Sequence, residues 1–343
     1  MIELRSDTAT KPSRAMRQAM ADAEVGDEQR REDPTVNELE RLGAELLGQE
    51  EAVYLPTATM ANQIALRILT RPGQEVLAEE SSHVFGAELA GAAVHSGLAH
   101  RSIESDNGRF TPADVRAKLR DWGSFHTPAT TVLVVEDTHN SSGGRYWRLD
   151  EALAIAEAAG DLDLKLHLDG ARLFNGAVAR GLPAADLARH FDTVSICLSK
   201  GLGAPLGALI AGSQELMAQA RWNKHLFGGA MRQAGIVAAG GLYALRHNVE
   251  RLADDHARAR RLAEGLAERG VPVRLDSVET NFVQIDVGED RSGALRRLRE
   301  EGVLLSSTIH PTVVRAVTHL DVGDADIDAA IELIPRALAY TPA

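Results

Sequence analysis

Cysteine is nearly absent from this chain of 343 residues, since Cys197 is the only one. An intrachain disulfide is therefore impossible, which fits the reducing cytoplasm, where we expect the protein to be located. The sequence also lacks any uninterrupted apolar run long enough to cross a bilayer, and residues 1–5 lack the apolar segment of a signal peptide. We therefore expect no membrane partner.

Positive charge is in the minority, because 49 acidic residues oppose 37 lysines and arginines and give a formal net charge of -12. A chain this acidic should repel phosphate backbones, so we expect no nucleic-acid partner. Hydrophobic residues make up 44% and charged residues 25%, as in ordinary globular proteins. The length exceeds what one hydrophobic core usually serves and is enough for two domains.

Short apolar runs alternate with helical patterns along the first two thirds of the chain. The runs that we predict as strands are residues 52–55, 75–78, 131–136, 165–168 and 193–198, with helices such as 59–69 and 150–159 between them. Apolar strands separated by helices indicate a parallel sheet that is covered on both faces. The predicted fold class is therefore α/β, with a mostly parallel sheet in a large domain.

The pattern changes after residues 228–229, where a long helical stretch runs from 232 to 269 with an interruption near 247–248. Shorter elements follow, with strands predicted at 271–275, 281–287 and 314–320 and helices at 291–301 and 326–339. This tail predicts a small α+β domain. We place the boundary inside the helical stretch, so that residues 1–245 form the large domain with its N-terminal arm and residues 246–343 form the small C-terminal domain.

Two candidate catalytic residues follow buried strands of the predicted sheet. Asp169 comes at the end of the run 165–168, and Lys200 follows the run 193–198. Ligands bind at the carboxyl ends of strands in open α/β sheets. Alone, Asp169 is more often a helix cap or the partner of Arg172, and Lys200 is more often a solvated loop lysine. Together they match pyridoxal phosphate (PLP), which needs a lysine for an imine and a carboxylate to keep its ring nitrogen protonated.

A phosphate site is predicted at residues 56–63, which pass from a strand into a helix through small and hydroxylated side chains. Backbone N–H groups and the dipole at a helix N-terminus attract phosphate. The same composition is also typical of an ordinary helix cap.

Three of the 12 histidines, His83, His126 and His139, flank predicted strands and are candidates for acid–base work. Most histidines are surface or structural, and this alternative stays open for each of the three. His167 and Asp169 could indicate a metal ligand pair, but no His-Glu-x-x-His or cysteine pair completes a site, so we expect no metal. No G-x-G-x-x-G motif follows an early strand, which argues against a dinucleotide-binding oxidoreductase.

Eight segments together carry a specific family pattern. They are LRSDTAT (4–10), EDPTVN (32–37), TMANQ (59–63), SH (82–83), LDGARLFN (168–175), CLSKGLGAP (197–205), MRQAG (231–235) and VTHLDV (317–322). In this order they make nearly the whole chain resemble the low-specificity L-threonine aldolases, which are β-eliminating lyases among the fold-type-I PLP enzymes. The resemblance implies an aspartate aminotransferase-like fold and PLP-dependent retro-aldol cleavage of L-threonine or L-allo-threonine to glycine and an aldehyde.

The resemblance also implies the residues that hold the cofactor. Lys200 would form the imine, Asp169 would pair with the pyridine nitrogen, and Arg172 would contact the phenolic oxygen. His83 would stack on the ring, and the pair Ala58-Thr59 would hold the phosphate.

The same resemblance implies a substrate site for a small amino acid. Ser6 and Arg315 would bind the carboxylate, a role that suits the planar fork of arginine, with Arg172 close by. His126 and His83 would face the β-hydroxyl. These residues would make the chain a lyase in which Lys200, Asp169 and the two histidines are catalytic.

A homotetramer with active sites at dimer interfaces is a further implication, with Arg232 reaching the phosphate of a neighbouring subunit. The chain departs from the family pattern at three places. Thr57-Ala58 replaces Ser-Gly, Arg30-Arg31 replaces Tyr-Gly, and Lys224-His225 stands where the family has Arg-Lys. Two alternatives remain: another fold-type-I PLP lyase that acts on a β-substituted amino acid, and a non-catalytic module with this fold. The presence of both His83 and His126 favours the aldolase.

Overall fold

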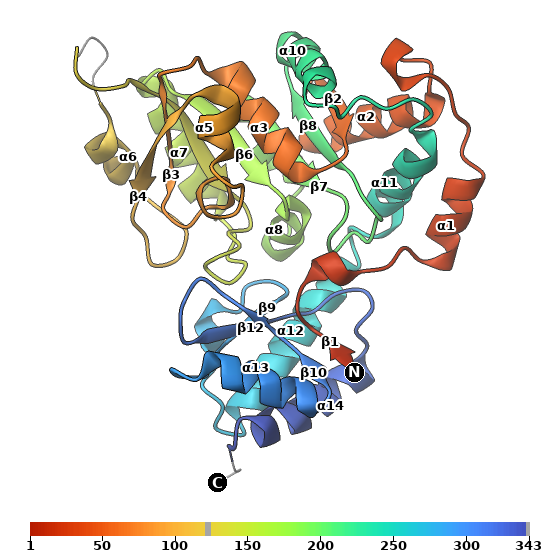
Figure 1. Cartoon of the computed structure of the whole chain (residues 1–343), viewed down its shortest axis with the longest axis vertical. Helices are drawn as coiled ribbons and strands as arrows, with labels where there is room; N and C mark the ends of the chain where they lie inside the picture. Colours follow the sequence, from red (N-terminus) through yellow and green to blue (C-terminus); the bar gives the residue numbers. More distant parts are fainter. Residues whose placement is uncertain (121–124, 341–343) are drawn as a thin grey trace.

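The computed structural model describes residues 1–120 and 125–340. These residues form two lobes that follow one another along the longest axis of the molecule (Figure 1). The larger lobe contains a seven-stranded sheet, and the smaller one contains a three-stranded antiparallel sheet. The architecture confirms the predicted α/β class with a mostly parallel sheet and a small C-terminal α+β part.

The seven-stranded sheet has the order β2-β8-β7-β6-β5-β3-β4. Its strands are β2 (Glu51–Leu55), β3 (Glu75–Glu79), β4 (Ala99–Ile103), β5 (Thr130–Glu136), β6 (Lys165–Gly170), β7 (Thr193–Cys197) and β8 (Ala208–Gly212). Neighbouring strands run parallel except for β8, which is antiparallel to both β7 and β2. Every residue of β3, β5, β7 and β8 is buried, as expected for strands that are covered on both faces.

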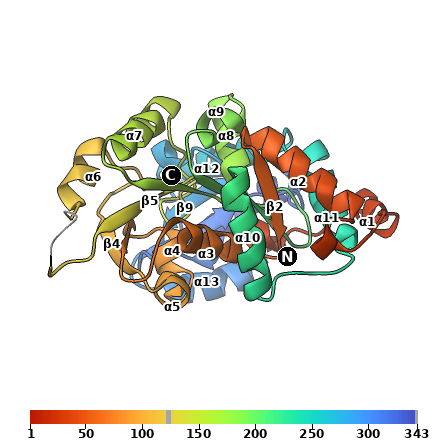
Figure 2. The same ribbon diagram turned by 90° about the horizontal axis from the view of Figure 1, so that it is seen from above.

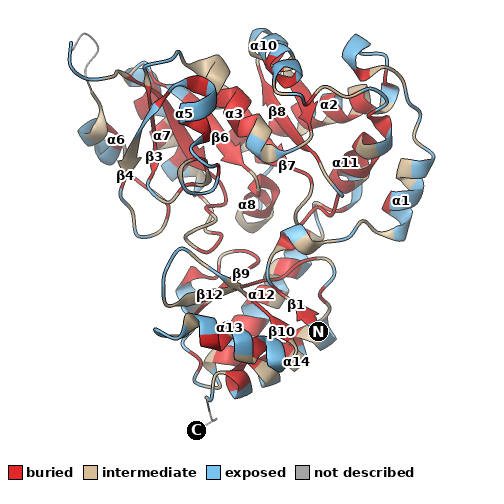
Figure 3. Ribbon diagram, in the orientation of Figure 1, coloured by how far each residue is buried: buried red, intermediate tan, exposed pale blue. Residues whose placement is uncertain are grey.

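Helices cover both faces of this sheet, as Figure 2 shows from above. On one face lie α3 (Ala58–Leu69), α4 (His83–Gly86), α5 (Gly91–Ser96) and α10 (Gln214–Leu226). On the other lie α2 (Pro34–Leu47), α6 (Pro112–Lys118), α7 (Leu149–Asp161), α8 (Leu173–Arg180), α9 (Ala184–Ala188) and α11 (Gly235–His247), with α1 (Arg14–Ala21) packed on α11. Figure 3 shows that buried residues are concentrated in the sheet and on the helix faces turned toward it.

The smaller lobe has a hydrophobic core of its own. Its elements are α12 (Leu252–Ala267), β9 (Phe282–Asp286), α13 (Arg291–Glu300), β10 (Val303–Leu304), β11 (Ser306–Ser307), β12 (Val313–Val317) and α14 (Asp324–Ala337). Three short 3-10 helices, η1 (Asp7–Ala9), η2 (Glu28–Arg30) and η3 (Leu275–Ser277), lie in connecting segments. None of the helices in the described residues is long and apolar enough to cross a membrane.

The N-terminal arm belongs to the core of the smaller lobe. Strand β1 (Ile2–Glu3) pairs in parallel with β10, so that Ile2 lies beside Val303. Ile2 and Leu4 are buried among residues of α12 and α14. The chain therefore enters the smaller lobe twice, and the boundary that we placed at residue 245 remains a prediction.

Candidate active site

The polar residues singled out near the ends of β6 and β7 meet at one edge of the large sheet. Asp169 lies in β6, and the strand register pairs it with Glu136 of β5 and Ser195 of β7. Lys200 follows β7, and Arg172 precedes the first residue of α8. Because β5, β6 and β7 are parallel, their carboxyl ends meet at the same edge, which is the edge that turns toward the smaller lobe in Figure 1.

Asp169 is 1% exposed and sits in a buried hydrogen-bond network. Its Oδ1 accepts the N–H of Ala171 at 3.1 Å, and its Oδ2 accepts the Asn62 amide at 2.8 Å. The Asn62 Oδ1 in turn accepts from Ser195 Oγ at 2.7 Å and contacts His167 Nε2 at 3.0 Å. Burial lowers the pKa of His167, so this ring is neutral and serves as a support for Asn62.

His83 begins α4 and is held at two points. Its backbone N–H donates to Glu136 Oε2 at 2.7 Å, and its Nδ1 lies 2.7 Å from Glu88 Oε1. The Glu88 side chain is fully buried, whereas the imidazole keeps 30% of its surface exposed. The hydrogen bond to Glu88 raises the pKa of His83, with burial opposing the shift and Asp169 adding to it.

Lys200 lies where the N-terminal arm passes the end of β7. Its carbonyl accepts the Thr10 hydroxyl at 2.9 Å and the Gly203 N–H at 2.9 Å, which fixes the backbone at this point. Ala171, Arg172 and Cys197 line the same small crevice as Lys200. Among the described residues no hydrogen bond or ion pair holds the Lys200 ammonium, so this group is available to react.

Arg172 forms a buried ion pair with Asp7 of the N-terminal arm. Its Nε and Nη2 donate to the two carboxylate oxygens of Asp7 at 2.7 and 2.6 Å, and its Nη1 reaches Asn140 Oδ1 at 3.3 Å. Burial opposes ionisation of Asp7, but the guanidinium of Arg172 outweighs it and holds the pKa of Asp7 below its usual range. One Nη1 hydrogen of Arg172 remains for a ligand.

Arg315 reaches the same place from β12 of the smaller lobe. Its Nη1 donates to Asn140 Oδ1 at 2.9 Å, and its Nε lies 3.3 Å from Ser306 Oγ. The guanidinium carbons of Arg315 and Arg172 lie 5.0 and 4.9 Å from the ring centre of Phe282. Within the described residues no carboxylate pairs with Arg315, and burial together with Arg172 lowers its pKa to about 10. The pair of arginines thus carries more positive charge than Asp7 can balance.

Ser6 and the first turn of α3 complete the predicted constellation. Ser6 caps η1, and its Oγ accepts from the Thr8 N–H at 3.2 Å. Thr57 caps α3 through a hydrogen bond from Met60 N–H, and Ala58 and Thr59 are the first residues of the helix. The N–H groups of a first turn have no acceptor within their own helix, so those of Ala58 and Thr59 suit an anion.

Two predicted residues lie away from this cluster. His126 is exposed, next to residues 121–124, which lie outside the described part of the chain. It precedes β5, whose first residue, Thr130, pairs with Glu75 at the edge opposite to Asp169. Arg232 is exposed and contacts Asp27 at 3.3 Å. The structure brings neither residue to the Lys200 of its own chain.

His139, the third candidate histidine, is buried beside two carboxylates. It is 1% exposed, and its Nε2 lies 3.0 Å from Glu79 and 4.0 Å from Glu136. Burial opposes its protonation, but the nearby carboxylates raise the pKa of His139. It therefore balances buried negative charge behind the site.

Two of the departures from the family pattern lie at η2 and in α10, while Thr57-Ala58 lies at the start of α3. Lys224 is buried in an ion pair with Glu28, and burial lowers the pKa of Lys224. Arg31 has a φ of 60°, a left-handed conformation that favours glycine, and its side chain pairs with Glu51 at 2.9 Å. His225 is exposed on α10.

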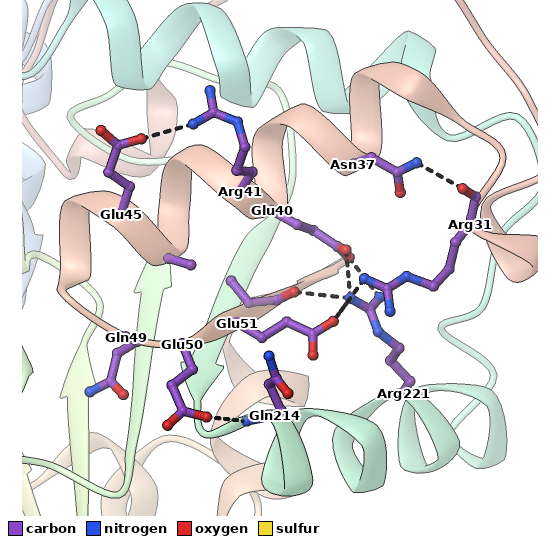
Figure 4. Close-up of a pocket in the computed structure, with 12 residues that line it drawn as sticks. Arg31, Asn37, Glu40, Arg41, Glu45, Gln49, Glu50, Glu51, Gln214 and Arg221 are labelled. Carbon is purple, nitrogen blue, oxygen red and sulfur yellow. Dashed lines mark hydrogen bonds and ion pairs between the residues drawn. The ribbon is translucent and has the colours of Figure 1, made fainter.

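A cavity of about 620 Å³ lies away from Lys200, which is not among its lining residues. It lies between α2, β2 and α10, where Figure 4 shows Arg31 and Arg221 directed toward Glu40 and Glu51. Arg221 bonds both oxygens of Glu40 at 3.0 and 2.7 Å, so its charge is already balanced. A cavity whose cations are paired internally does not offer a charge to a ligand.

Several residues of the site escaped the sequence reasoning. Asp7 and Asn62 lie inside quoted segments and Asn140 follows the candidate His139, but none of them was given a role. Glu88 and Phe282 were not singled out either. Glu88 is an isolated acid in a stretch of small and apolar residues, and such an acid is a detectable signal because burial demands a partner. Phe282 carried no signal of its own.

Comparison with known proteins agrees with this geometry. The family model described as beta-eliminating lyase matches residues 3–289. A protein named probable low-specificity L-threonine aldolase 2, from Arabidopsis thaliana, is 39% identical over 98% of this chain and 96% of its own length. The low specificity L-threonine aldolase of Escherichia coli K12 is 41% identical over 94% of this chain and 95% of its own length.

A solved structure shares the fold as well. The threonine aldolase of Leishmania major superposes with a TM-score of 0.86 at 21% identity, covering 98% of this chain and all of that one. Taken with the aldolase relatives and the residues gathered at the ends of β6 and β7, these matches establish that the chain belongs to the beta-eliminating lyase family.

Proposed function

We propose that this protein cleaves L-threonine, L-allo-threonine and related β-hydroxy-α-amino acids to glycine and an aldehyde, with PLP bound at Lys200. The observation that carries the proposal is the convergence of three residues at one sheet edge: a buried aspartate, and a lysine and an arginine for which the described residues provide no carboxylate partner. The relatives named as low-specificity L-threonine aldolases support the substrate class.

The residues present fit PLP. Lys200 offers an unengaged amine for covalent attachment, and Asp169 offers a buried carboxylate that already accepts two hydrogen bonds. The first turn of α3 offers N–H groups at Ala58 and Thr59 for the phosphate. When bound, PLP supplies an aldehyde carbon for the amine and a protonated ring that accepts electron density from the substrate.

Asp169 holds a proton on the pyridine nitrogen, because a buried anion at this point stabilises the protonated ring. Its own position is fixed by Asn62 and Ala171, so little reorganisation is needed when charge develops. Lys200 would hold the cofactor covalently through its amine.

Arg315 binds the substrate carboxylate, with Ser6 beside it on the N-terminal arm. An anion there balances the charge that Asp7 leaves uncompensated on the two arginines. Fixing the carboxylate orients the Cα–Cβ bond relative to the cofactor ring, and this orientation decides which bond breaks. His83 then removes the proton of the β-hydroxyl, for which a neutral imidazole is suited near pH 7.

The test is to load the purified protein with PLP and assay glycine and acetaldehyde after adding L-threonine or L-allo-threonine. Release of both products from either isomer is the expected result. Release of pyruvate and ammonia from a β-substituted amino acid, with no acetaldehyde from threonine, would replace the proposal with the alternative of another PLP lyase.

We further propose a cytoplasmic homotetramer in which active sites lie at dimer interfaces. Support comes from Arg232, which is exposed and contacts Asp27, and from exposed apolar side chains such as Leu89 (96%) and Trp222 (65%). Light scattering after gel filtration measures the mass. Trp222→Glu is expected to give smaller particles, and an unchanged mass in that variant would exclude α10 from the interface.

A further inference from the structure

We propose that Glu88 is a positioning residue that fixes the tautomer of His83, so that the ring carries its proton on Nδ1 and presents Nε2 to the substrate. The inference deepens the proposed aldol cleavage and rests on it, because it concerns the base of that reaction. It is carried by the contact of 2.7 Å between His83 Nδ1 and Glu88 Oε1.

The environment of Glu88 shows why it acts as an acceptor. Its side chain is fully buried, and Oε2 accepts from Gln63 Nε2 at 2.6 Å while Oε1 accepts from Asn62 Nδ2 at 2.8 Å. Both amides donate, so each carboxylate oxygen of Glu88 acts as an acceptor. An ionised carboxylate can only accept, and the His83 nitrogen that faces it must therefore carry the hydrogen.

The tautomer follows from this constraint. A neutral imidazole has one N–H, and when that hydrogen is held on Nδ1 the lone pair is on Nε2. His83 is the partly exposed member of the pair, so Nε2 is the nitrogen that a ligand can reach. Glu88 thus determines both the direction of the ring and the atom that accepts the β-hydroxyl proton.

Asn62 connects this pair to the cofactor side of the site. Its amide nitrogen donates one hydrogen to Glu88 Oε1 and the other to Asp169 Oδ2, both at 2.8 Å. Its carbonyl oxygen is occupied by Ser195 and His167, which prevents the amide from turning over. The residue that holds His83 and the residue assigned to the ring nitrogen are therefore positioned by one side chain.

The backbone after Glu88 gives an independent sign that its position is constrained. Leu89 and Ala90 both have positive φ, 52° and 58°, although neither is glycine. Consecutive residues in this region are strained, and such strain persists where surrounding contacts over-determine the conformation. Leu89 is 96% exposed and gains nothing from this geometry, whereas Glu88 is directed inward.

A metal ion is the competing interpretation of the cluster. Ligand atoms of His83, Glu88 and Asp169 lie within 4.8 Å of one another. Amide donors of Asn62 and Gln63 occupy the carboxylates, however, and a cation would have to displace these hydrogens. We therefore assign a proton rather than a metal ion to the space between His83 and Glu88.

The first measurement uses the apoprotein, so it does not depend on catalysis. Diethylpyrocarbonate acylates only neutral imidazole, and the rate at His83 is followed against pH by peptide mass spectrometry, with and without EDTA. Three acidic groups face His83 and raise its pKa: Glu88, then Asp169 and Glu136. In Glu88→Gln the midpoint for His83 is expected at lower pH, while that of the exposed His190, in the turn after α9, stays unchanged.

The second measurement uses the PLP-loaded enzyme. A base must be neutral to work, so the acidic limb of kcat against pH lies at the raised pKa of His83 and is expected to move to lower pH in Glu88→Gln. Loss of the fixed tautomer should also lower the plateau of kcat by about 100-fold. KM should change little, because Glu88 does not touch the carboxylate site.

Glu157→Gln, which removes an exposed carboxylate from α7, is the matched control. It should leave unchanged the pH dependence of His83 acylation and the pH dependence of kcat. If Glu88→Gln does not fold, Glu88→Asp keeps the charge but withdraws it by one methylene and should lower kcat with KM retained. An unmoved His83 midpoint in a folded Glu88 variant would overturn the inference, as would a wild-type midpoint that shifts on adding EDTA. A protein without aldolase activity but with the expected midpoints would instead contradict the proposed function alone.

Discussion

Asp169 and Lys200 are separated by 31 positions in the sequence, yet each owes its place to the same circumstance, the end of a buried parallel strand. The residues around them are of two kinds. Some are proposed to contact the ligand, and the others hold the contacting residues in position. Reasoning from strand ends singled out Asp169 and Lys200, and the family resemblance implied the other residues that we expect to face the ligand. Neither located Asn62 or Glu88, because a buried amide or carboxylate is recognised by its partners, and those partners come from distant segments.

Replacing Asp169 with asparagine tests its assignment to the ring nitrogen. The amide keeps the volume and one of the two accepted hydrogen bonds but removes the charge, so the cofactor should still bind while kcat falls by about 100-fold or more. Cofactor absorbance and initial rates measure the two effects. Asp163→Asn is the control, since it lies in an exposed turn with a φ of 53° that asparagine tolerates. Near-normal kcat in Asp169→Asn would remove the residue from its role.

Replacing Arg315 with alanine tests the carboxylate site. A charged hydrogen bond contributes about 1.5–3 kcal/mol, so KM for threonine should rise about 10- to 150-fold. Steady-state kinetics gives the value, with the exposed Arg299→Ala on α13 as the control. A KM unchanged in Arg315→Ala, with the variant folded, would mean that the substrate carboxylate binds elsewhere.

At the scale of elements, the alternation of apolar runs and helical patterns predicted most of the large sheet and the interruption between α11 and α12. The strand predicted at 271–275 was wrong, because the structure has only a single bridge from Val273 to Ile285 there. Pro272 cannot donate to a strand ladder, which explains the difference. Strand β4 was missed because it lies at the sheet edge with Ala99 and His100 exposed, so its apolar pattern is weak.

The connection between α4 and α5 offers a test of stored backbone strain. Ala90 has a φ of 58°, where an L-residue costs about 1–2 kcal/mol and glycine does not. Glycine relieves this strain but loses more conformational entropy on folding. Ala90→Gly should therefore leave the free energy of unfolding unchanged or raise it by up to about 1 kcal/mol. Thermal unfolding measures the change. Ala93→Gly, at an exposed position inside α5, should destabilise by about 1 kcal/mol, and an equal loss in both variants would contradict the argument.

At the scale of the whole molecule, the ion pair between Asp7 and Arg172 ties the N-terminal arm to the large lobe. Both side chains are buried, so Asp7→Asn leaves an uncompensated guanidinium and should destabilise the protein by about 3–5 kcal/mol near pH 7. The contact joins residues 165 positions apart, and for that reason composition and local patterns did not predict it.

The effect of this substitution should depend on pH. Arg172 holds the pKa of Asp7 below its ordinary value of 3.8, although burial alone would raise it. A carboxyl with a lowered pKa stabilises the fold above its unfolded pKa, and this contribution is lost as the pH falls through the folded value. The difference in melting temperature between wild type and Asp7→Asn should therefore be largest above about pH 4 and shrink in more acid solution. A constant difference from pH 2 to 7 would contradict the linkage.

The parallel pairing of Ile2 with Val303 has a consequence for synthesis on the ribosome. The 301 positions between them take about 15–60 s to translate at about 5–20 residues per second. The large lobe can close its sheet in that time, while the segment that carries Ser6 and Asp7 waits for its partner strand. The nascent chain would therefore form the proposed attachment point for the cofactor, Lys200, before the proposed carboxylate site of Ser6 and Arg315 is complete, and catalytic competence would be the last property to appear.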